Sequence, residues 1–106
     1  MATKTTQIEV TACDNELYII ASTGAFSSEL CHIKSGYNDP VSYKVRPQAI
    51  LPAGAYSLIF VGINWGGPSA FKVTLTQSTG APIVLTAPNN LPVGATWTPP
   101  AVQTNV

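Results

Sequence analysis

Apolar and polar residues alternate along much of this chain, so that every second residue is apolar. A β-strand turns successive side chains to opposite faces, and the alternation therefore predicts strands with one buried face. Residues 17–21 instead form a continuous apolar run, which is typical of a strand covered on both faces. The alternating segments are residues 8–12, 30–33, 41–46, 56–61, 71–76 and 83–86, with a last short one at 95–98.

Turn-forming residues separate these segments, and no segment repeats its apolar residues at helical spacing over three turns. Pro52 with Gly54, and Pro92 with Gly94, suit a turn because proline fixes φ and glycine accepts the conformation that follows. The two similar segments are either independent turns that each precede a strand, or the remains of a duplication of half the domain. Seven to eight short strands, with turns at intervals of roughly 8–12 residues, predict an all-β fold. We expect a single antiparallel β-sandwich of jelly-roll or Ig-like type.

The alternation also predicts which residues form the core. The apolar face of each strand is expected to point inward, and an error of one residue in register exchanges the two faces. The expected core residues are Val10, Leu17, Ile19, Val41, Tyr43, Leu58, Phe60, Phe71, Val73, Leu75 and Leu85.

The end of the chain differs from the rest because two prolines, Pro99 and Pro100, follow each other. Proline lacks a backbone donor, so the sequence predicts that this end is extended and lies outside the sheet. We therefore divide the chain into a β-sandwich domain, residues 1–98, and an extended proline-containing tail, residues 99–106. The candidate contacts of this end with another protein are Trp97, Pro99, Pro100 and Val102.

Charged residues are scarce, and none follows Lys72. The chain has five basic and five acidic residues, or 9% in all, whereas soluble domains have about 25%. An uncharged surface favours association, because nothing charged must be desolvated at a contact. The composition predicts either a surface rich in hydroxyl groups or one that a partner covers, and a homo-oligomer is the preferred interpretation.

Composition also excludes two classes of partner. The basic residues are scattered, whereas nucleic-acid binding needs a basic patch. The longest apolar run, residues 49–63, is interrupted by Pro52, Gly54 and Ser57 and is too short to span a membrane. The first ten residues lack the apolar stretch of a signal peptide, so we expect synthesis in the cytoplasm, followed by incorporation into a virion or release from the cell.

No catalytic motif is present, and we expect neither enzyme activity nor a cofactor. His32 is the single histidine, and Cys31 beside it points to the opposite face of a strand, so the two do not form a dyad. Asp14 and Glu16 are close in sequence but are expected in a turn, as ordinary solvated acids. The sequence motifs of a serine nucleophile, a zinc protease or a phosphate loop do not occur.

Metal binding is not expected either, with one alternative left open. Zinc needs four suitably spaced ligands, and the chain has three residues of the Cys/His type. Calcium takes oxygen ligands, which residues 14–16 and 38–39 offer only where their loops meet. Cys13 and Cys31 are expected to be free thiols, because a pair of cysteines in a chain without a leader is more often buried than bridged.

These observations favour a non-enzymatic structural subunit of a symmetric or repeating assembly. Its most concrete form is a viral (phage) capsid decoration or fibre-type protein, whose partner is a second copy or a host particle. The supporting features are the missing charges and the uncharged strands after Val73, whose edges suit a tight contact.

The alternative is a small bacterial lectin-like module that binds glycans through aromatic residues in loops. Trp65 is its main residue, because two glycines follow it and leave one face of the ring open; otherwise Trp65 ends a strand and folds back onto the core. The candidate glycan-binding residues are Tyr37, Asn38, Asp39, Asn64 and Trp65. A small secreted toxin or inhibitor is a third interpretation.

Overall fold

The computed structural model describes residues 3–36, 39–88 and 91–106. Within these residues nearly all of the regular secondary structure is strand, which confirms the predicted all-β class, and no helix there is long and apolar enough to cross a membrane. Neighbouring strands of the sheet run antiparallel to one another. The elements are β1 (Thr5–Ser22), β2 (Ser27–Ser35), β3 (Tyr43–Val45), η1 (Pro47–Ala49), β4 (Ala55–Ile63), β5 (Ala70–Gln77), β6 (Ile83–Thr86), β7 (Thr96–Trp97) and β8 (Val102–Asn105).

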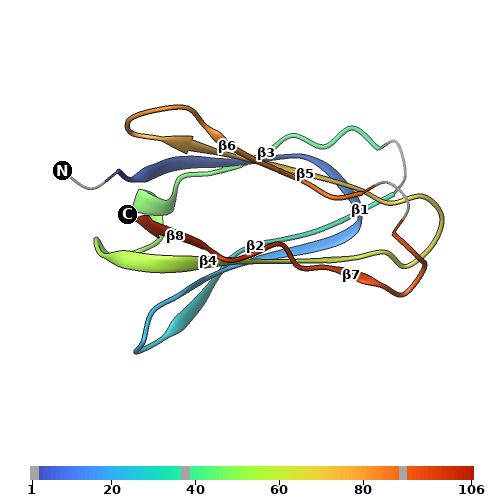
Figure 1. The fold of residues 1–106 in the computed structure, drawn as a ribbon, viewed down its shortest axis with the longest axis horizontal. Coiled ribbons are helices and arrows are strands. Elements are labelled where there is room, and N and C mark those ends of the chain that lie inside the picture. The colour runs from blue at the N-terminus through green and yellow to red at the C-terminus, as the bar shows by residue number, and fades with distance from the viewer. Residues whose placement is uncertain (1–2, 37–38, 89–90) are drawn as a thin grey trace.

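The eight strands of the described chain form one curled sheet with the order β6-β5-β1-β4-β7. β2 and β3 also pair with β1, and β8 also pairs with β4. Figure 1 shows the result as two halves that face each other, one with β3, β5 and β6 and the other with β2, β4, β7 and β8. The antiparallel, curled sheet agrees with the coarse prediction for the fold.

The long strand β1 runs through both halves of the sheet (Figure 1). Up to Asp14 it pairs with β5 and β3, and from Asn15 onward it pairs with β2 and β4. The sequence predicts two strands here, separated by a turn that holds Asp14 and Glu16. That turn is a wrong prediction, because the strand finds partners on β5 up to Asp14 and on β4 from Glu16 onward.

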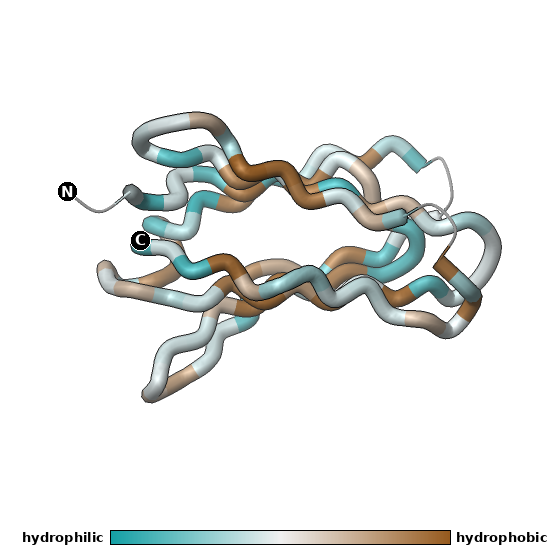
Figure 2. The backbone as a smooth tube through the Cα atoms, viewed as in Figure 1, coloured by the Kyte–Doolittle hydropathy of each residue, from teal (hydrophilic) through white to brown (hydrophobic). Residues whose placement is uncertain are grey.

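The core lies between the two halves, and Figure 2 shows hydrophobic segments on strands of both. The prediction for Tyr43 is wrong: it is 43% exposed, at the first position of β3, which pairs with β1 at only three positions. Val41 and Leu85 are partly buried against the core. The predicted core residues found buried are Val10, Leu17, Ile19, Leu58, Phe60, Phe71, Val73 and Leu75.

The end of the chain belongs to the sheet, so the prediction of a tail outside it is wrong. β8 pairs with β4 over four residues, and Val106 exchanges backbone hydrogen bonds of 2.9 and 3.2 Å with Gly54. The hydroxyl groups of Thr104 and Thr5 lie 2.6 Å apart and are buried. Pro99 and Pro100 lack backbone N–H groups, but the residues of β8 that follow them keep their N–H groups and can pair with β4.

Two of the four candidate contacts with another protein pack within the chain itself. Trp97 is buried in β7, with its ring stacked on that of Phe71 at 5.4 Å between centroids. Val102 lies in β8 and is partly buried against the core, whereas Pro99 is partly exposed and Pro100 is exposed. A role of these residues in assembly stays a prediction, and Trp97 has little surface to offer to a partner.

Both cysteines are free and buried. Burial, and after it the neighbouring Cys31, raises the pKa of the Cys13 thiol to about 12. Burial likewise raises the pKa of Cys31 to about 11. The two thiols are therefore protonated at neutral pH, and they act as small apolar residues of the core.

Candidate functional site

A cluster of polar and aromatic side chains lies where β1, β2 and the loop after β4 meet. Glu16 is buried in β1, and the register places it opposite Lys34 on β2. Tyr18 follows two residues later on β1, opposite His32. Because residues i and i+2 of a strand point to the same face, these four side chains share one face of the sheet.

The Glu16 carboxylate accepts three hydrogen bonds in this cluster. Its Oε2 accepts from His32 Nε2 at 2.5 Å and from the Tyr18 hydroxyl at 3.0 Å, and its Oε1 accepts from Trp65 Nε1 at 2.8 Å. The bonds from His32 and then Trp65 hold the pKa of Glu16 down to about 2. The same carboxylate raises the pKa of Tyr18. Glu16 is thus a weak base that fixes its neighbours, which does not suit it to proton transfer.

Trp65 is held in place and yet exposed. The side-chain oxygen of Asn15 accepts the backbone N–H of Trp65 at 2.7 Å and that of Gly66 at 3.0 Å. With the indole N–H bonded to Glu16, both the backbone and the ring of Trp65 are fixed. The residue is nevertheless 62% exposed. The alternative in which Trp65 folds back onto the core is therefore wrong, because polar bonds to β1 hold the ring at the surface.

Two further polar groups border the cluster. The rings of Tyr18 and His32 are stacked at 4.1 Å between centroids and 13° between planes. The Lys34 ammonium lies 4.0 Å from Glu16 Oε2, and its side chain is mostly exposed. The His32 imidazole and the Lys34 ammonium group therefore lie close to the buried Glu16 carboxylate, which also accepts the hydrogen bond from the Trp65 indole.

Asn64, predicted to bind a ligand, has a structural role instead. Its side chain is buried, and its amide donates to the carbonyl oxygens of Gly67 at 3.0 Å and Leu91 at 2.7 Å. Its side-chain oxygen accepts the backbone N–H of Gly66 at 3.2 Å. Asn64 thus shapes the loop that carries Trp65, and its hydrogen-bonding groups are used within the chain.

Asp39, another predicted glycan-binding residue, takes no part in the hydrogen bonds of this cluster. Asp39 is exposed, and its Oδ2 accepts the backbone N–H of Gly36 at 2.8 Å, as expected for a turn. Tyr37 and Asn38 lie outside the described residues. Of the three predicted glycan-binding residues that the structure describes, Trp65 is the one with an exposed aromatic ring.

Sequence reasoning misses Asn15 and Glu16, which hold Trp65, and Tyr18 and His32, which are hydrogen-bonded to Glu16. The alternation of Glu16 and Tyr18 with apolar neighbours is a visible signal, since both are polar or amphipathic and two residues apart. Their contact with His32 and Trp65 depends on the pairing of β1 with β2 and on the path of the loop after β4, and the sequence specifies neither of these directly.

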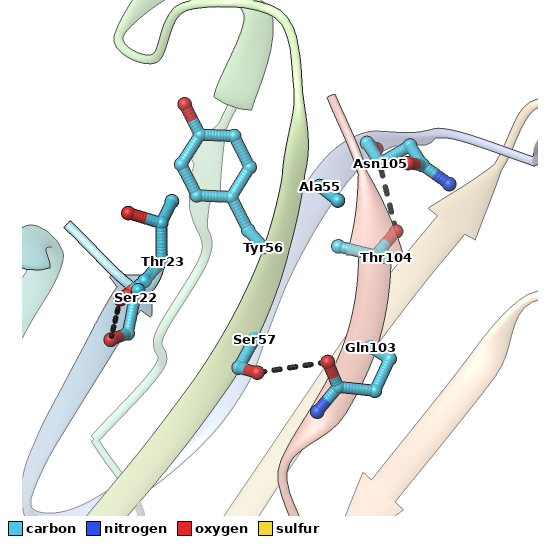
Figure 3. A pocket seen from close by; sticks show the side chains of 9 residues that line it. Ser22, Thr23, Ala55, Tyr56, Ser57, Gln103, Thr104 and Asn105 are labelled. Atoms are coloured by element: carbon cyan, nitrogen blue, oxygen red, sulfur yellow. Dashed lines mark hydrogen bonds between the residues drawn. The ribbon is translucent and has the colours of Figure 1, made fainter. Parts of the chain in front are cut away.

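A polar hollow of about 530 Å³ lies where β4 begins (Figure 3). Ser57 on β4 donates a hydrogen bond of 2.9 Å to Gln103 on the neighbouring β8, as the dashed line in Figure 3 marks. Hydroxyl and amide groups line the hollow and no charged side chain does, which suits a neutral polar ligand. The lining residues are Ser22, Thr23, Gly24, Ala55, Tyr56, Ser57, Gln103, Thr104 and Asn105.

Comparison of the chain with protein-family models, with curated proteins and with solved structures gives no match.

Proposed function

We propose that this protein is a non-enzymatic, lectin-like module that binds glycans through Trp65. The observation that carries the proposal is an exposed indole whose ring nitrogen and backbone are both held by hydrogen bonds. Sugar rings stack on aromatic faces through their apolar C–H groups. A ring that is already immobile loses little conformational entropy when a ligand stacks on it, so more of the contact energy remains as affinity.

The surroundings of Trp65 support the same proposal. Around Gly66 and Gly67 the space is open, with no atom within 4 Å of the point where a side chain would begin. Gly67 has a φ of +71°, a conformation that side chains disfavour, so the loop keeps this opening. The exposed Lys34 offers a donor, and Nδ1 of the half-exposed His32 offers a second hydrogen-bonding group, for the hydroxyls of a sugar.

The proposal includes a more specific description of the fold than a curled antiparallel sheet. We interpret the curled sheet as a β-sandwich of jelly-roll or Ig-like type, in which binding residues lie on loops at one end. Trp65 lies on such a loop, directly after β4.

Replacing Trp65 by alanine is expected to abolish glycan binding and to leave the fold intact. The substitution removes the stacking surface but no core contact, because the ring is mostly exposed. Binding is measured on a glycan array, and the fold is checked by the circular-dichroism spectrum of the variant.

The matched control for this experiment is Phe26→Ala. Phe26 is also an exposed aromatic residue, but it lies in the turn before β2 and packs edge-on against Tyr56. This variant is expected to bind as the unaltered protein does. Failure of the unaltered protein to bind any glycan, or full binding by the Trp65→Ala variant, contradicts the proposal.

A second candidate function is that of a structural subunit, and the edge strand β6 favours it. β6 pairs only with β5 in the described chain, and it exposes Ile83 and Val84 without any charged residue to block a further strand. A second copy adding its own β6 would extend the sheet about a two-fold axis. This arrangement would suit a capsid decoration or fibre-type protein.

Val84→Lys is expected to convert such an assembly into monomers, since pairing of two β6 strands about a two-fold axis brings like charges together and lysine at a strand edge opposes strand addition. Val93→Lys, at an exposed position outside the strands, is the matched control and is expected to keep the assembly. Light scattering measures the mass. A monomeric unaltered protein at high concentration would exclude this second function and leave the glycan proposal standing.

A further inference from the structure

Asp14 is a buried carboxylate for which the described part of the chain supplies no hydrogen-bond partner. The residue is 1% exposed, and neither of its two side-chain oxygens accepts a hydrogen bond there. Burying a carboxylate without a partner is strongly unfavourable, and proteins generally pair such a group or give it a cation. The side chain therefore needs an explanation that the fold alone does not give.

Asp14 also lines a small pocket of about 220 Å³ together with a second acid, Asp39. The pocket is lined by residues 11–14 of β1, by Gly36 and Asp39, which follow β2, and by Ala70 at the start of β5. Asp14 is the buried acid of the pair and Asp39 is the exposed one. The hydrogen bond from the Gly36 N–H to Asp39 Oδ2 orients the second carboxylate at this pocket.

We propose that this pocket is a calcium site, with the carboxylates of Asp14 and Asp39 as its protein anchors. Calcium takes six to eight oxygen ligands and accepts backbone carbonyls and water beside carboxylates, so two acids with water are a workable set. Among the described residues no three His, Cys, Asp or Glu side chains come together as ligands of one metal ion, so a zinc-type cage is a poor fit and calcium here needs carbonyl and water oxygens beside the two acids.

From the sequence, calcium binding is an alternative if residues 14–16 and 38–39 lie close together. In the structure Asp14 and Asp39 do share a pocket, whereas Glu16 is engaged by Trp65 and His32. The site is thus separate from the Glu16 cluster and does not depend on the glycan proposal. With few protein ligands, an affinity in the weak range of extracellular calcium modules is expected, with a Kd of about 10⁻⁴–10⁻³ M.

The test is the melting temperature of the full chain, stripped of metal with EDTA and then given calcium. A ligand that binds only the folded state raises the melting temperature by mass action. At about 10 mM CaCl₂ and the expected affinity, the rise is about 5 °C or more for a domain of this size. Sodium chloride of equal ionic strength is the solvent control and is expected to give no such rise.

Asp14→Asn and Asp39→Asn are both expected to lose the calcium response. Because Asp39 is exposed, its substitution tests the site even where Asp14→Asn fails to fold. Glu9→Gln is the matched control: it removes an acid from the same strand, and Glu9 does not line the pocket. It is expected to keep the full rise. An unchanged melting temperature of the parent in calcium, or an equal rise in the Asp39→Asn variant, overturns the proposal.

Discussion

Phe60→Ala is expected to destabilise the protein by about 3–5 kcal/mol. Phe60 is fully buried in β4, where it pairs with Ile19 of β1 at the centre of the core. Truncation to alanine removes the transfer free energy of the ring and leaves a cavity that the surrounding strands fill only in part. Since domains of this kind are stable by only about 5–15 kcal/mol, the loss is a large share of the total.

The free energy of unfolding of this variant is measured by denaturant melts. The neighbouring Ile59 gives a matched control, because it lies on the same strand but points to the opposite, exposed face. Ile59→Ala is expected to cost less than about 1 kcal/mol. A loss below about 1 kcal/mol for Phe60→Ala as well would contradict the placement of Phe60 in the core.

Ending the chain after Ala101 is expected to destabilise the protein by about 4 kcal/mol or more. The truncation removes the β8 partner from the first four residues of β4 and takes away the buried Val106. It also leaves the Thr5 hydroxyl without Thr104, its partner at 2.6 Å. The truncated chain therefore loses apolar burial, strand hydrogen bonds and a buried polar pair together.

Thermal melts followed by circular dichroism measure this effect. Pro100→Ala is the control, since Pro100 is exposed and lies outside the strands, and it is expected to melt as the unaltered chain does. A truncated chain that melts within about 2 °C of the full chain would show that the last residues are a dispensable tail after all.

The strands with regular alternation could be predicted from the sequence almost to their ends. Residues 56–61 and 71–76 fall within β4 and β5, and residues 83–86 coincide with β6. β1 could not be predicted as one strand, because its polar residues 14–16 have the composition of a turn and their burial depends on strands that come later. β8 could not be predicted because a proline pair precedes it and its four residues include a single apolar one, Val102.

The candidate site was predictable only in its most exposed member. Trp65 stands out in the sequence because two glycines follow it. Glu16 is hydrogen-bonded to Trp65 on the loop after β4 and to His32 on the paired strand β2, so these bonds follow from the tertiary arrangement and not from local pattern. For Asn64 the local sequence misleads. Its place beside Trp65 suggests a ligand contact, but the side chain is buried and its amide donates to backbone carbonyl oxygens of the chain itself.

The place of β1 in the sheet also governs the order in which the protein can fold during synthesis. β1 is synthesised before all of its partner strands, and its pairing with β2 is the first of its strand pairings that can form. Its partners β4 and β5 follow much later, and the partner of Thr5 is Thr104, two residues before the end of the chain. Such distant pairing is slow, because long loops must close before the contacts form. Completion of the sheet therefore waits for the synthesis of β8, and the first half of β1 lacks its β5 partner until residues 70–77 have been made.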